Sequence, residues 1–302
     1  MSKIKTLNAK RLVAVFTAML ITILSLSYTN NNHADALNSN VKYYVYDAKT
    51  AEKIDEYFLS PLPYSLNTRN VVGNDDRVID WTKSGVVKIM SPNKSIGSGF
   101  VVSDHVIATA AHCVYTNKIS EILLFDNNGK QVMSATPVEY HIPSDYITSL
   151  KRLAYDYALI SVKEDLSDYA CFDLGVTLDS FPDTGSTISV TGFPNTITRN
   201  GKRITVNTST EHMMYTGNGT VKRYNDDGSP PFHNISDLIY YDCDISEGNS
   251  GGPAYITESF KGKTYYTVIA INAHTKGDTN DGIRINTNLI NFYKANQCII
   301  WE

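Results

Sequence analysis

Three stretches that lie far apart in the chain each contain one residue that acyl transfer requires. His112 lies in "TAAHC", Asp156 in "YDYALISV" and Ser250 in "EGNSGGP". A serine hydroxyl is a poor nucleophile at neutral pH unless a neighbouring base takes its proton, and histidine has a suitable pKa for that role. A buried aspartate can fix the histidine tautomer and stabilise the imidazolium. The three residues therefore predict a catalytic triad: Ser250 as nucleophile, His112 as general acid and base, and Asp156 as the orienting carboxylate.

The glycines around Ser250 indicate a sharply bent or closely approached backbone. Gly248 stands two residues before the serine, and Gly251, Gly252 and Pro253 follow it directly. Such a run is unfavourable unless the bend is needed, because glycine loses much freedom on folding and proline lacks a backbone donor. The bend allows the N–H groups of Gly248 and Ser250 to point at one spot. We expect these two donors to form an oxyanion hole, in which one donor contributes about 3 kcal/mol.

Each of these residues also has an ordinary structural interpretation when it is taken alone. A lone histidine is usually packed or solvated, a lone aspartate at a strand start is usually a turn former, and a glycine-flanked serine can be a tight hairpin. We expect such roles for the other histidines and for two aspartates: His33, His105, His141, His212, His233, Asp145 and Asp168. The joint occurrence in the order His, Asp, Ser favours catalysis.

The segments that must position these residues are short and β-like. Runs such as "GFVVSDHVIATAAH", "YALISV" and "YYTVIAINAH" are separated by turn signals such as Asn200-Gly201 and Asp227-Gly228. Many short strands with this punctuation predict an all-β barrel or sandwich. Only the end differs, because apolar residues recur at helical spacing in "NTNLINFYKANQ". We expect a C-terminal helix over 289–297, capped by Asn286 or Asn288.

The N-terminal 36 residues have the composition of a secretory signal. Four basic residues precede an apolar run over 12–26, and a small-x-small site ends at Ala36. The alternative is a transmembrane anchor, but the run is short for a bilayer and no later segment is apolar enough to span one. Residues 37–69 are polar and rich in tyrosine, and they end in "PLPYSLNTR", which predicts an exposed linker that a protease can cut.

Cysteines and charge exclude several classes of function. Cys113, Cys171, Cys243 and Cys298 form no CxxC pair, which argues against a zinc or redox motif. In an oxidising compartment they allow up to two disulfides in three pairings, or they stay buried and free. The net charge is −4 with no basic face, so nucleic acid is not an expected partner. The proposed chemistry needs neither a metal nor an organic cofactor, and a structural calcium stays an open alternative although no calcium motif occurs.

At the triad residues the sequence resembles the chymotrypsin-like serine proteases. The stretches "GSGFVVSDHVIATAAHC", "DYALI" and "GNSGGP" match the histidine, aspartate and serine motifs of that family in order and spacing. The resemblance covers about residues 70–302. It implies two six-stranded antiparallel β-barrels, about 70–172 and 173–302, with the triad between them.

A closer resemblance is to the glutamyl endopeptidases that Gram-positive bacteria secrete. It rests on "NVVGNDDR" after Arg69, on "VTGFP" over 190–194, and on "AHTKG" followed by "GIRI". It implies that His274 binds the glutamate side chain before the scissile bond (P1), with help from Ser246 and the α-amino group of Asn70. Residues 37–69 would then be a propeptide that an activating protease removes after Arg69.

Two residues depart from the pattern of these glutamyl endopeptidases. Ile245 stands where threonine or serine is expected, and Glu247 near the pocket mouth should repel an acidic side chain. The cysteines depart from the wider chymotrypsin-like family. In that family the cysteine after the histidine pairs with a second cysteine, and Gly97 stands at the place of that second cysteine. The family can bridge the regions that contain Cys171 and Cys298, so the resemblance suggests that pair as a disulfide.

Together these features predict a secreted, extracellular and monomeric serine endopeptidase. It would be made as a zymogen, act on proteins or peptides, and prefer Glu or Asp at P1. One alternative is a toxin-like protease of narrow or different P1 specificity, which would share every catalytic residue. Another is a non-catalytic secreted binding protein on the same fold, since folds are reused without their chemistry. The intact triad favours an enzyme.

Overall fold

The computed structural model describes most of the chain from Val41 onwards. The predicted signal segment, the Arg69–Asn70 bond and the proposed Cys171–Cys298 pair all lie outside the described residues. None of the described helices has the length and hydrophobicity needed to cross a membrane. The described residues are 41–59, 75–92, 94–148, 152–169, 172–175, 182–222, 238–276 and 279–295.

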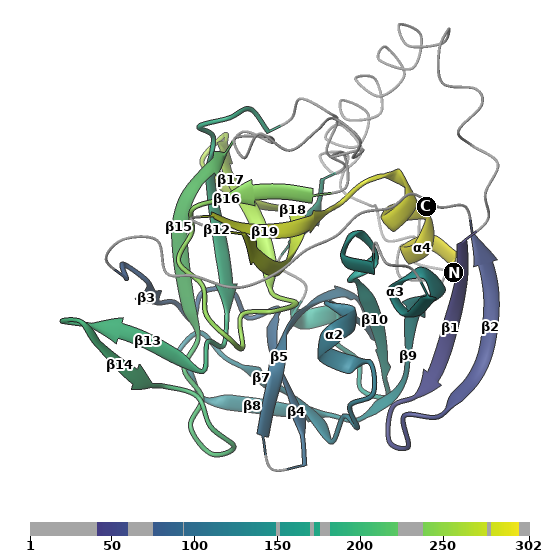
Figure 1. Cartoon of the computed structure of the whole chain (residues 1–302). Helices are drawn as coiled ribbons and strands as arrows, with labels where there is room; N and C mark the ends of the chain where they lie inside the picture. Colours follow the sequence, from purple (N-terminus) through teal and green to yellow (C-terminus); the bar gives the residue numbers. More distant parts are fainter. Residues whose placement is uncertain are drawn as a thin grey trace, which may run out of the picture. The chain divides into compact units, whose positions relative to one another are not determined.

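The first sheet contains nine antiparallel strands and curls around a hydrophobic core (Figure 1). The strands β9, β10, β6, β5, β4 and β7 supply its central part, β8 follows at one end, and β1 and β2 extend the other. In sheet order the strands are β2 (Lys53–Leu59), β1 (Val41–Asp47), β9 (Pro137–Pro143), β10 (Ala158–Val162), β6 (Val106–Thr109), β5 (Lys94–Ser103), β4 (Val86–Ser91), β7 (Glu121–Phe125) and β8 (Gln131–Ala135).

The second sheet closes into a six-stranded barrel, because its first and last long strands also pair with each other. A short parallel strand, β11 (Asp173–Leu174), lies at its edge, and β3 (Val78–Ile79) pairs with β15. A separate hairpin joins β13 (Thr196–Arg199) to β14 (Lys202–Thr205). The barrel strands are β18 (Lys263–Lys276), β17 (Pro253–Phe260), β12 (Thr187–Gly192), β15 (Tyr215–Lys222), β16 (Leu238–Tyr241) and β19 (Thr279–Arg284).

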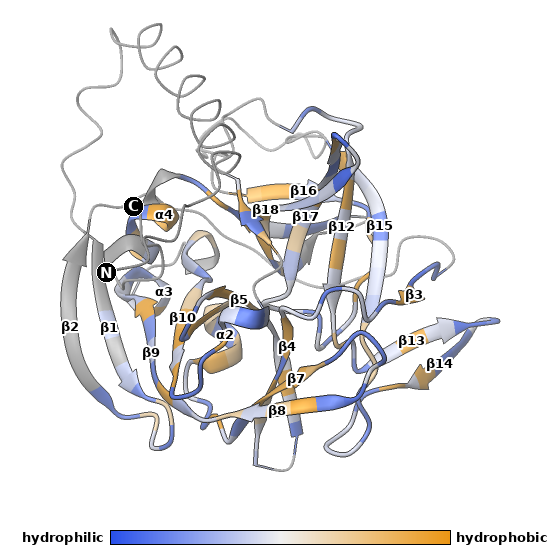
Figure 2. Cartoon of the chain, turned by 180° about the vertical axis from the view of Figure 1, so that it is seen from behind, coloured by the Kyte–Doolittle hydropathy of each residue, from blue (hydrophilic) through white to orange (hydrophobic). Residues whose placement is uncertain are grey.

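Hydrophobic residues line the inner faces of both sheets, and Figure 2 shows them along β4, β7, β10 and β12. Every residue of β4 is buried, because both faces of the strand are covered. One face packs in the core of the first sheet, and the other packs against residues of the chain over 193–214. Lys88 lies in the middle of this strand, and its ammonium contacts Asn207, the carbonyls of Thr208 and Glu211, and His212. A buried cation is stable only when its hydrogen-bond donors have acceptors. These contacts therefore hold β4 against the chain over 207–212.

The C-terminal helix, α4 (Thr287–Ala295), begins where the sequence predicts a cap. The side chain of Asn286 accepts the N–H of Leu289 at 3.0 Å, which satisfies one of the free donors at the start of the helix. Phe292 is fully buried, and its ring lies 5.2 Å from that of Tyr157. The helix therefore packs against the residue that follows Asp156.

The predicted all-β architecture of two barrels and a C-terminal helix is confirmed, with one correction on the N-terminal side. Residues 41–59, which the sequence suggested were part of an exposed linker, form the hairpin of β1 and β2 on the edge of β9. Strand β1 contributes to the core, because Tyr46 is buried against Tyr140. The first barrel is therefore an open curled sheet that the hairpin extends.

Candidate active site

His112 is placed by a short helix that follows directly from a buried strand. Strand β6 ends at Thr109, and α2 (Ala111–Val114) begins after Ala110. Ala110 and Ala111 have no exposed surface, and their small side chains let the chain turn tightly against the core. The imidazole is 27% exposed, so it can reach both the interior and a substrate.

Asp156 is fully buried between a 3-10 turn, η1 (Arg152–Tyr155), and strand β10. Its Oδ1 accepts the backbone N–H of His112 at 2.8 Å, and its Oδ2 accepts the Nδ1–H of the same residue at 2.6 Å. This bidentate contact fixes both the position of the histidine and its tautomer, with Nε2 left as the basic nitrogen.

The charges of the pair reinforce this geometry. Burial alone would raise the pKa of Asp156, but the charge and hydrogen bond of His112, together with the hydrogen bond of His274, hold that pKa well below its usual range. Burial opposes the charging of His112, but the adjacent carboxylate outweighs it and raises the pKa of His112 above its ordinary value. Asp156 therefore stays ionised and stabilises an imidazolium at His112.

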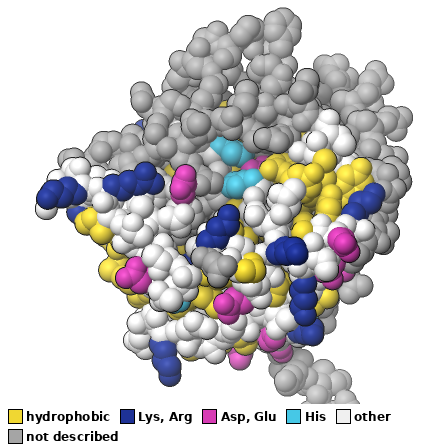
Figure 3. Space-filling model, turned by 60° about the horizontal axis from the view of Figure 1, so that its bottom comes forward, with side chains coloured by type: hydrophobic (Ala, Val, Ile, Leu, Met, Phe, Trp, Pro, Cys, Tyr) yellow, Lys and Arg dark blue, Asp and Glu magenta, His cyan; other side chains and the backbone are white. Residues whose placement is uncertain are grey.

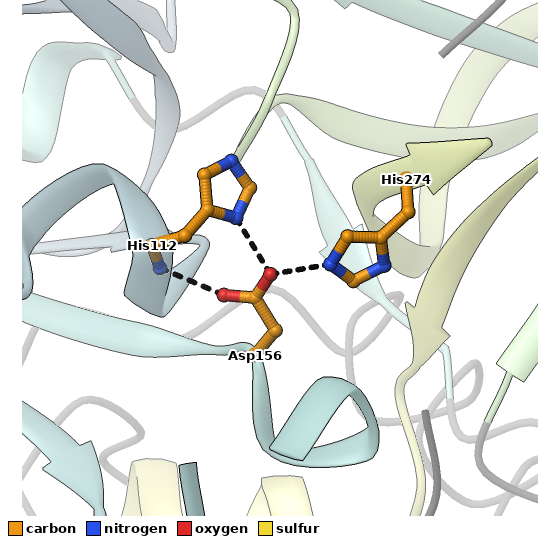
Figure 4. A group of neighbouring side chains, drawn as sticks. All are labelled: His112, Asp156 and His274. Carbon is orange, nitrogen blue, oxygen red and sulfur yellow. Dashed lines mark hydrogen bonds and ion pairs between the residues drawn. The ribbon is translucent and has the colours of Figure 1, made fainter. Parts of the chain in front are cut away.

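A second histidine contacts the same carboxylate, as Figure 4 shows. The Nε2 atom of His274 lies 2.6 Å from Oδ2 of Asp156, and its Nδ1 atom lies 3.1 Å from Oδ1 of Asp281. A β-bulge between Asn272 and His274 in β18 directs the ring towards the first sheet. With a pKa raised to about 9, His274 carries a proton on both nitrogens at neutral pH and can donate to both carboxylates.

His274 is therefore a buried cation between two anions. Burial lowers its pKa, but the hydrogen bonds to Asp156 and Asp281 outweigh burial and raise the pKa of His274 to about 9. The sequence predicted that His274 would bind a substrate carboxylate. In the described arrangement both nitrogens are occupied within the chain, so such binding would require one of these contacts to open.

Ser250 lies between two glycines whose backbone conformation strongly favours glycine. Gly248 and Gly251 have φ angles of +96° and +82°. A Cβ atom at Gly248 would collide with the carbonyl of Phe193, and one at Gly251 would collide with Thr109 and with the carbonyl of Ser98. This region of backbone space is unfavourable for L residues with side chains, so the glycines of the motif are required by geometry.

The backbone of Ser250 is fixed against the elements that hold the other two residues. Its carbonyl accepts the N–H of Ser98 at 2.7 Å and lies 3.5 Å from Sγ of Cys113, the residue after His112. The N–H of Gly251 donates to the carbonyl of Asn272 at 2.8 Å, two residues before His274. The structure thus brings the loop of Ser250 to the place where His112 and His274 approach Asp156.

The two predicted oxyanion donors are oriented through the carbonyl groups of their own peptide bonds. The carbonyl of Glu247 accepts the N–H of Asn195, and a trans peptide therefore points the N–H of Gly248 the opposite way. The carbonyl of Asn249 accepts from Gly252 and from the side chain of Asn272, which fixes the N–H of Ser250 in the same manner. Both donors are held by hydrogen bonds before any substrate arrives.

Ser246 lies beside a buried arginine that the sequence analysis did not single out. The Nη1 group of Arg77 donates to Oγ of Ser246 at 3.0 Å and reaches Oδ1 of Asn249 at 3.4 Å. Its other donors contact Asp75, at 2.9 Å from Nε and 2.6 Å from Nη2. Arg77 is only 1% exposed, so a cation is fixed against the loop that leads to Ser250. The only sequence signal was its place in "NVVGNDDR".

The other predicted substrate-binding positions are placed as follows. The hydroxyl of Ser246 donates to the carbonyl of Thr196 at 2.6 Å. Ile245 belongs to the core of the second barrel, so that position offers no hydroxyl to a pocket, and Glu247 is exposed. Asn70 lies outside the described residues.

The structure places Gly97 opposite Cys113, at the two positions that a disulfide joins in the wider family. A Cβ atom built at Gly97 would lie 2.5 Å from Sγ of Cys113, so these two positions face each other. Among the described residues, Cys113 and Cys243 are both buried and free.

Among the described residues, one group of side chains is of the types that could hold a metal ion. The group consists of His112, Asp156 and His274. Their candidate ligand atoms lie within 4.8 Å of one another. Hydrogen bonds between these same atoms account for the arrangement without an ion. Histidine side chains reach the molecular surface close together on the face shown in Figure 3.

A two-sheet β fold that brings a His–Asp pair to a glycine-bracketed serine defines the class of chymotrypsin-like serine peptidases. The model of the trypsin-like peptidase domain matches residues 97–259, which is more than half of the chain. The chain therefore belongs to the trypsin-like peptidase family. A comparison with curated proteins found no match.

One similar solved structure supports the same fold, and a second is less similar. A Glu endopeptidase in complex with MPD superposes with a TM-score of 0.58 at 19% identity, covering 76% of this chain and 100% of that chain. The Rv3671c protease in its inactive form gives a TM-score of 0.42 at 18% identity, covering 71% of this chain and 89% of the other. At this identity, the likeness to the Glu endopeptidase concerns the fold alone.

Proposed function

We propose that the chain is a serine endopeptidase that hydrolyses peptide bonds through an acyl-enzyme on Ser250. The observation that carries this proposal is the bidentate contact between His112 and Asp156, with hydrogen bonds of 2.6 and 2.8 Å. The carboxylate fixes both the backbone and the Nδ1–H of His112. The free nitrogen, Nε2, is then the one that can exchange a proton with a substrate.

Acylation begins when a peptide carbonyl enters beside Ser250. The Oγ atom attacks the carbonyl carbon while Nε2 of His112 takes the hydroxyl proton. The oxyanion accepts hydrogen bonds from the N–H groups of Gly248 and Ser250, and Asp156 stabilises the imidazolium. Collapse of the tetrahedral intermediate breaks the C–N bond, and His112 gives its proton to the leaving amine.

Deacylation repeats the same steps with water as the nucleophile. His112 takes a proton from water, the hydroxide attacks the ester, and the second oxyanion uses the same two donors. The proton then returns to Oγ of Ser250, which releases the carboxylic acid product. Both half-reactions use only side chains and backbone groups of this chain.

Reaction with a fluorophosphonate probe tests this proposal directly. Such probes form a covalent bond with an activated serine, so the processed protein should be labelled at Ser250 and should lose its peptidase activity in proportion. The Ser250→Ala variant should be neither labelled nor active. Peptide hydrolysis that persists in this variant would show that the catalyst lies elsewhere.

For substrate choice, we propose an acidic residue at P1. A P1 carboxylate needs positive charge or several donors. Support comes from the roles that the family resemblance implies for His274, Ser246 and the Asn70 amino group. The similar solved structure is named a Glu endopeptidase, and that description is of the other protein.

A second candidate is a serine protease with narrow or different P1 specificity, and one observation favours it. Both nitrogens of His274 contact carboxylates of the chain itself. A peptide library randomised at P1 distinguishes the two candidates, with Ser250→Ala as the blank. Cleavage concentrated after Glu and Asp supports acidic recognition, whereas cleavage after other residues removes it and leaves the triad in place.

Secretion and activation are part of the proposal as well. Residues 1–36 would act as a signal, residues 37–69 as a propeptide, and cleavage after Arg69 would free Asn70. N-terminal sequencing of the active extracellular protein tests these boundaries. A first residue far from Asn70 would contradict the proposed activation site.

A further inference from the structure

The outer edge of β9 is occupied by a segment from the N-terminal side of the proposed activation site. Strand β1 pairs with β9 in antiparallel register, from Tyr43 opposite Pro143 to Asp47 opposite Glu139. Strand β2 pairs in turn with β1. An unpaired strand edge exposes a row of backbone donors and acceptors that attract another strand. The hairpin over 41–59 pairs with this edge of β9 and so satisfies its backbone groups (Figure 1).

Side chains add to the backbone pairing. The ring of Tyr46 stacks on that of Tyr140, with centroids 5.0 Å apart and planes 8° from parallel. It also meets the ring of Tyr115 edge to face at 6.1 Å. Tyr46 is 9% exposed and Tyr140 is fully buried, so the hairpin supplies part of the hydrophobic core.

The turn of the hairpin is fixed at the same place. Ala48 is fully buried, its N–H donates to the carbonyl of Val138, and its carbonyl accepts the N–H of Ile119, both at 3.0 Å. The carboxylate of Asp47 accepts the N–H groups of Lys49 and Thr50, which caps the turn. The hairpin thus contacts both β9 and the loop that follows the helix of His112.

We propose that the β9 edge is a binding surface for residues 41–59 and that the hairpin stays bound as a separate fragment after the chain is cut at Arg69. The folded enzyme then consists of two chains, and only the connecting segment changes at activation. The proposal uses the proposed cleavage site but not the proposed chemistry. Through Tyr46 on Tyr115 and Ala48 on Ile119, the bound hairpin also supports the loop behind His112.

The test uses the full chain with Ser250→Ala, which removes self-digestion, and a recognition site for a site-specific protease in place of residues within 60–69. After complete cleavage, native mass spectrometry and size-exclusion chromatography report whether the fragment and the protease body remain together. Retention in a one-to-one complex supports the proposal. Separation of the fragment, with the body folded or not, overturns it.

Two substitutions make the result specific to the surface. Tyr46→Ala removes the stacked ring, and we expect the cleaved fragment to dissociate at least about ten-fold faster. Lys49→Ala changes an exposed side chain of the same turn and should leave retention unchanged. Equal dissociation of the two variants would show that the contact with Tyr140 does not hold the fragment. Because Ser250 is absent throughout, a failure of the proposed peptidase activity cannot produce either outcome.

Discussion

Nε2 of His274 lies 2.6 Å from Oδ2 of Asp156, the same oxygen that accepts the ring N–H of His112. The catalytic carboxylate is thus shared between two imidazoles whose ring centroids are 5.8 Å apart. Since His274 also contacts Asp281 and is doubly protonated, it neutralises part of the negative charge that His112 experiences. The basicity of His112 therefore depends on a residue of the other barrel.

His274→Gln should keep a donor near Asp156 but remove the positive charge. With that charge gone, the imidazolium of His112 is more stable, and its pKa rises by roughly one to two pH units. Because the general base must be neutral, the acid limb of kcat/KM moves to higher pH. A pH profile of kcat/KM measures this, and an acid limb that stays in place would contradict the charge coupling.

The same variant tests the role that the sequence predicted for His274. If the residue binds a P1 carboxylate, His274→Gln should reduce the ratio of cleavage after Glu to cleavage after Ala. If it acts only on Asp156, this ratio stays the same while kcat falls. The two readouts separate substrate binding from positioning.

Activity and stability of the unmodified enzyme should respond to pH in opposite directions. The pKa of His112 is raised, so kcat/KM should rise with pH through a value above the ordinary 6.5 of histidine. The raised pKa of His274 contributes stability that is complete below the unfolded value of 6.5 and is lost as pH rises through about 9. Thermal unfolding of Ser250→Ala across this range checks the second half. A Tm that rises between pH 7 and 9 would contradict it.

The glycine before the nucleophile can be tested against a glycine with the same backbone conformation. Gly248 and Gly185 have φ angles of +96° and +89°, but a Cβ atom at Gly185 meets nothing within 4 Å. Gly185→Ala should cost about 1–2 kcal/mol through backbone strain alone. Gly248→Ala adds a collision with the carbonyl of Phe193, so it should destabilise the protein further and abolish hydrolysis by moving an oxyanion donor. Denaturant unfolding and kcat measure the two effects, and equal behaviour of the variants would refute the collision.

The buried arginine next to the nucleophile loop should stabilise the fold. Arg77→Met removes the closer of the two arginines that pair with Asp75, and we expect the free energy of unfolding to fall by about 3 kcal/mol. Arg203→Met is the matched control, because Arg77 and Arg203 both donate to Thr196 but Arg203 is exposed. It should change stability by less than about 0.5 kcal/mol. Similar losses for the two variants would mean that burial of the Arg77–Asp75 pair is unimportant.

Local motifs explain which parts of the site were predictable. His112, Asp156 and Ser250 each lie in a stretch whose composition fits one role, and Asn286 caps the helix that the periodicity predicts. The strands around them follow from β-branched and aromatic runs between turn residues. In each case the signal lies within a few residues of the position that it specifies.

Sequence reasoning missed one non-local contact and one local hairpin. The contact of His274 with Asp156 depends on a bulge in β18 and on the approach of two barrels, and no spacing within the chain encodes it. The hairpin over 41–59 was interpreted as linker because the polar segment over 37–69 ends in two prolines and an asparagine before Arg69. The aromatic and β-branched residues of "VKYYVYD" and "KIDEYFL", separated by the short segment "AKTAE", could have revealed it.

The last prediction concerns the two facing positions behind the nucleophile. A Cβ atom at Gly97 would lie 2.5 Å from Sγ of Cys113, so Gly97→Cys should form a disulfide after a small shift of Cys113. The bond would close the loop between positions 97 and 113. For a loop of this length, restricting the unfolded chain stabilises the protein by about 3 kcal/mol. Gly97→Ala meets the same crowding without the bond and is the control. Thiol titration and Tm, with and without dithiothreitol, follow the outcome. Two titratable thiols at these positions in the oxidised Gly97→Cys protein would show that the backbone of Ser250, 3.0 Å from the new Cβ, prevents the bond.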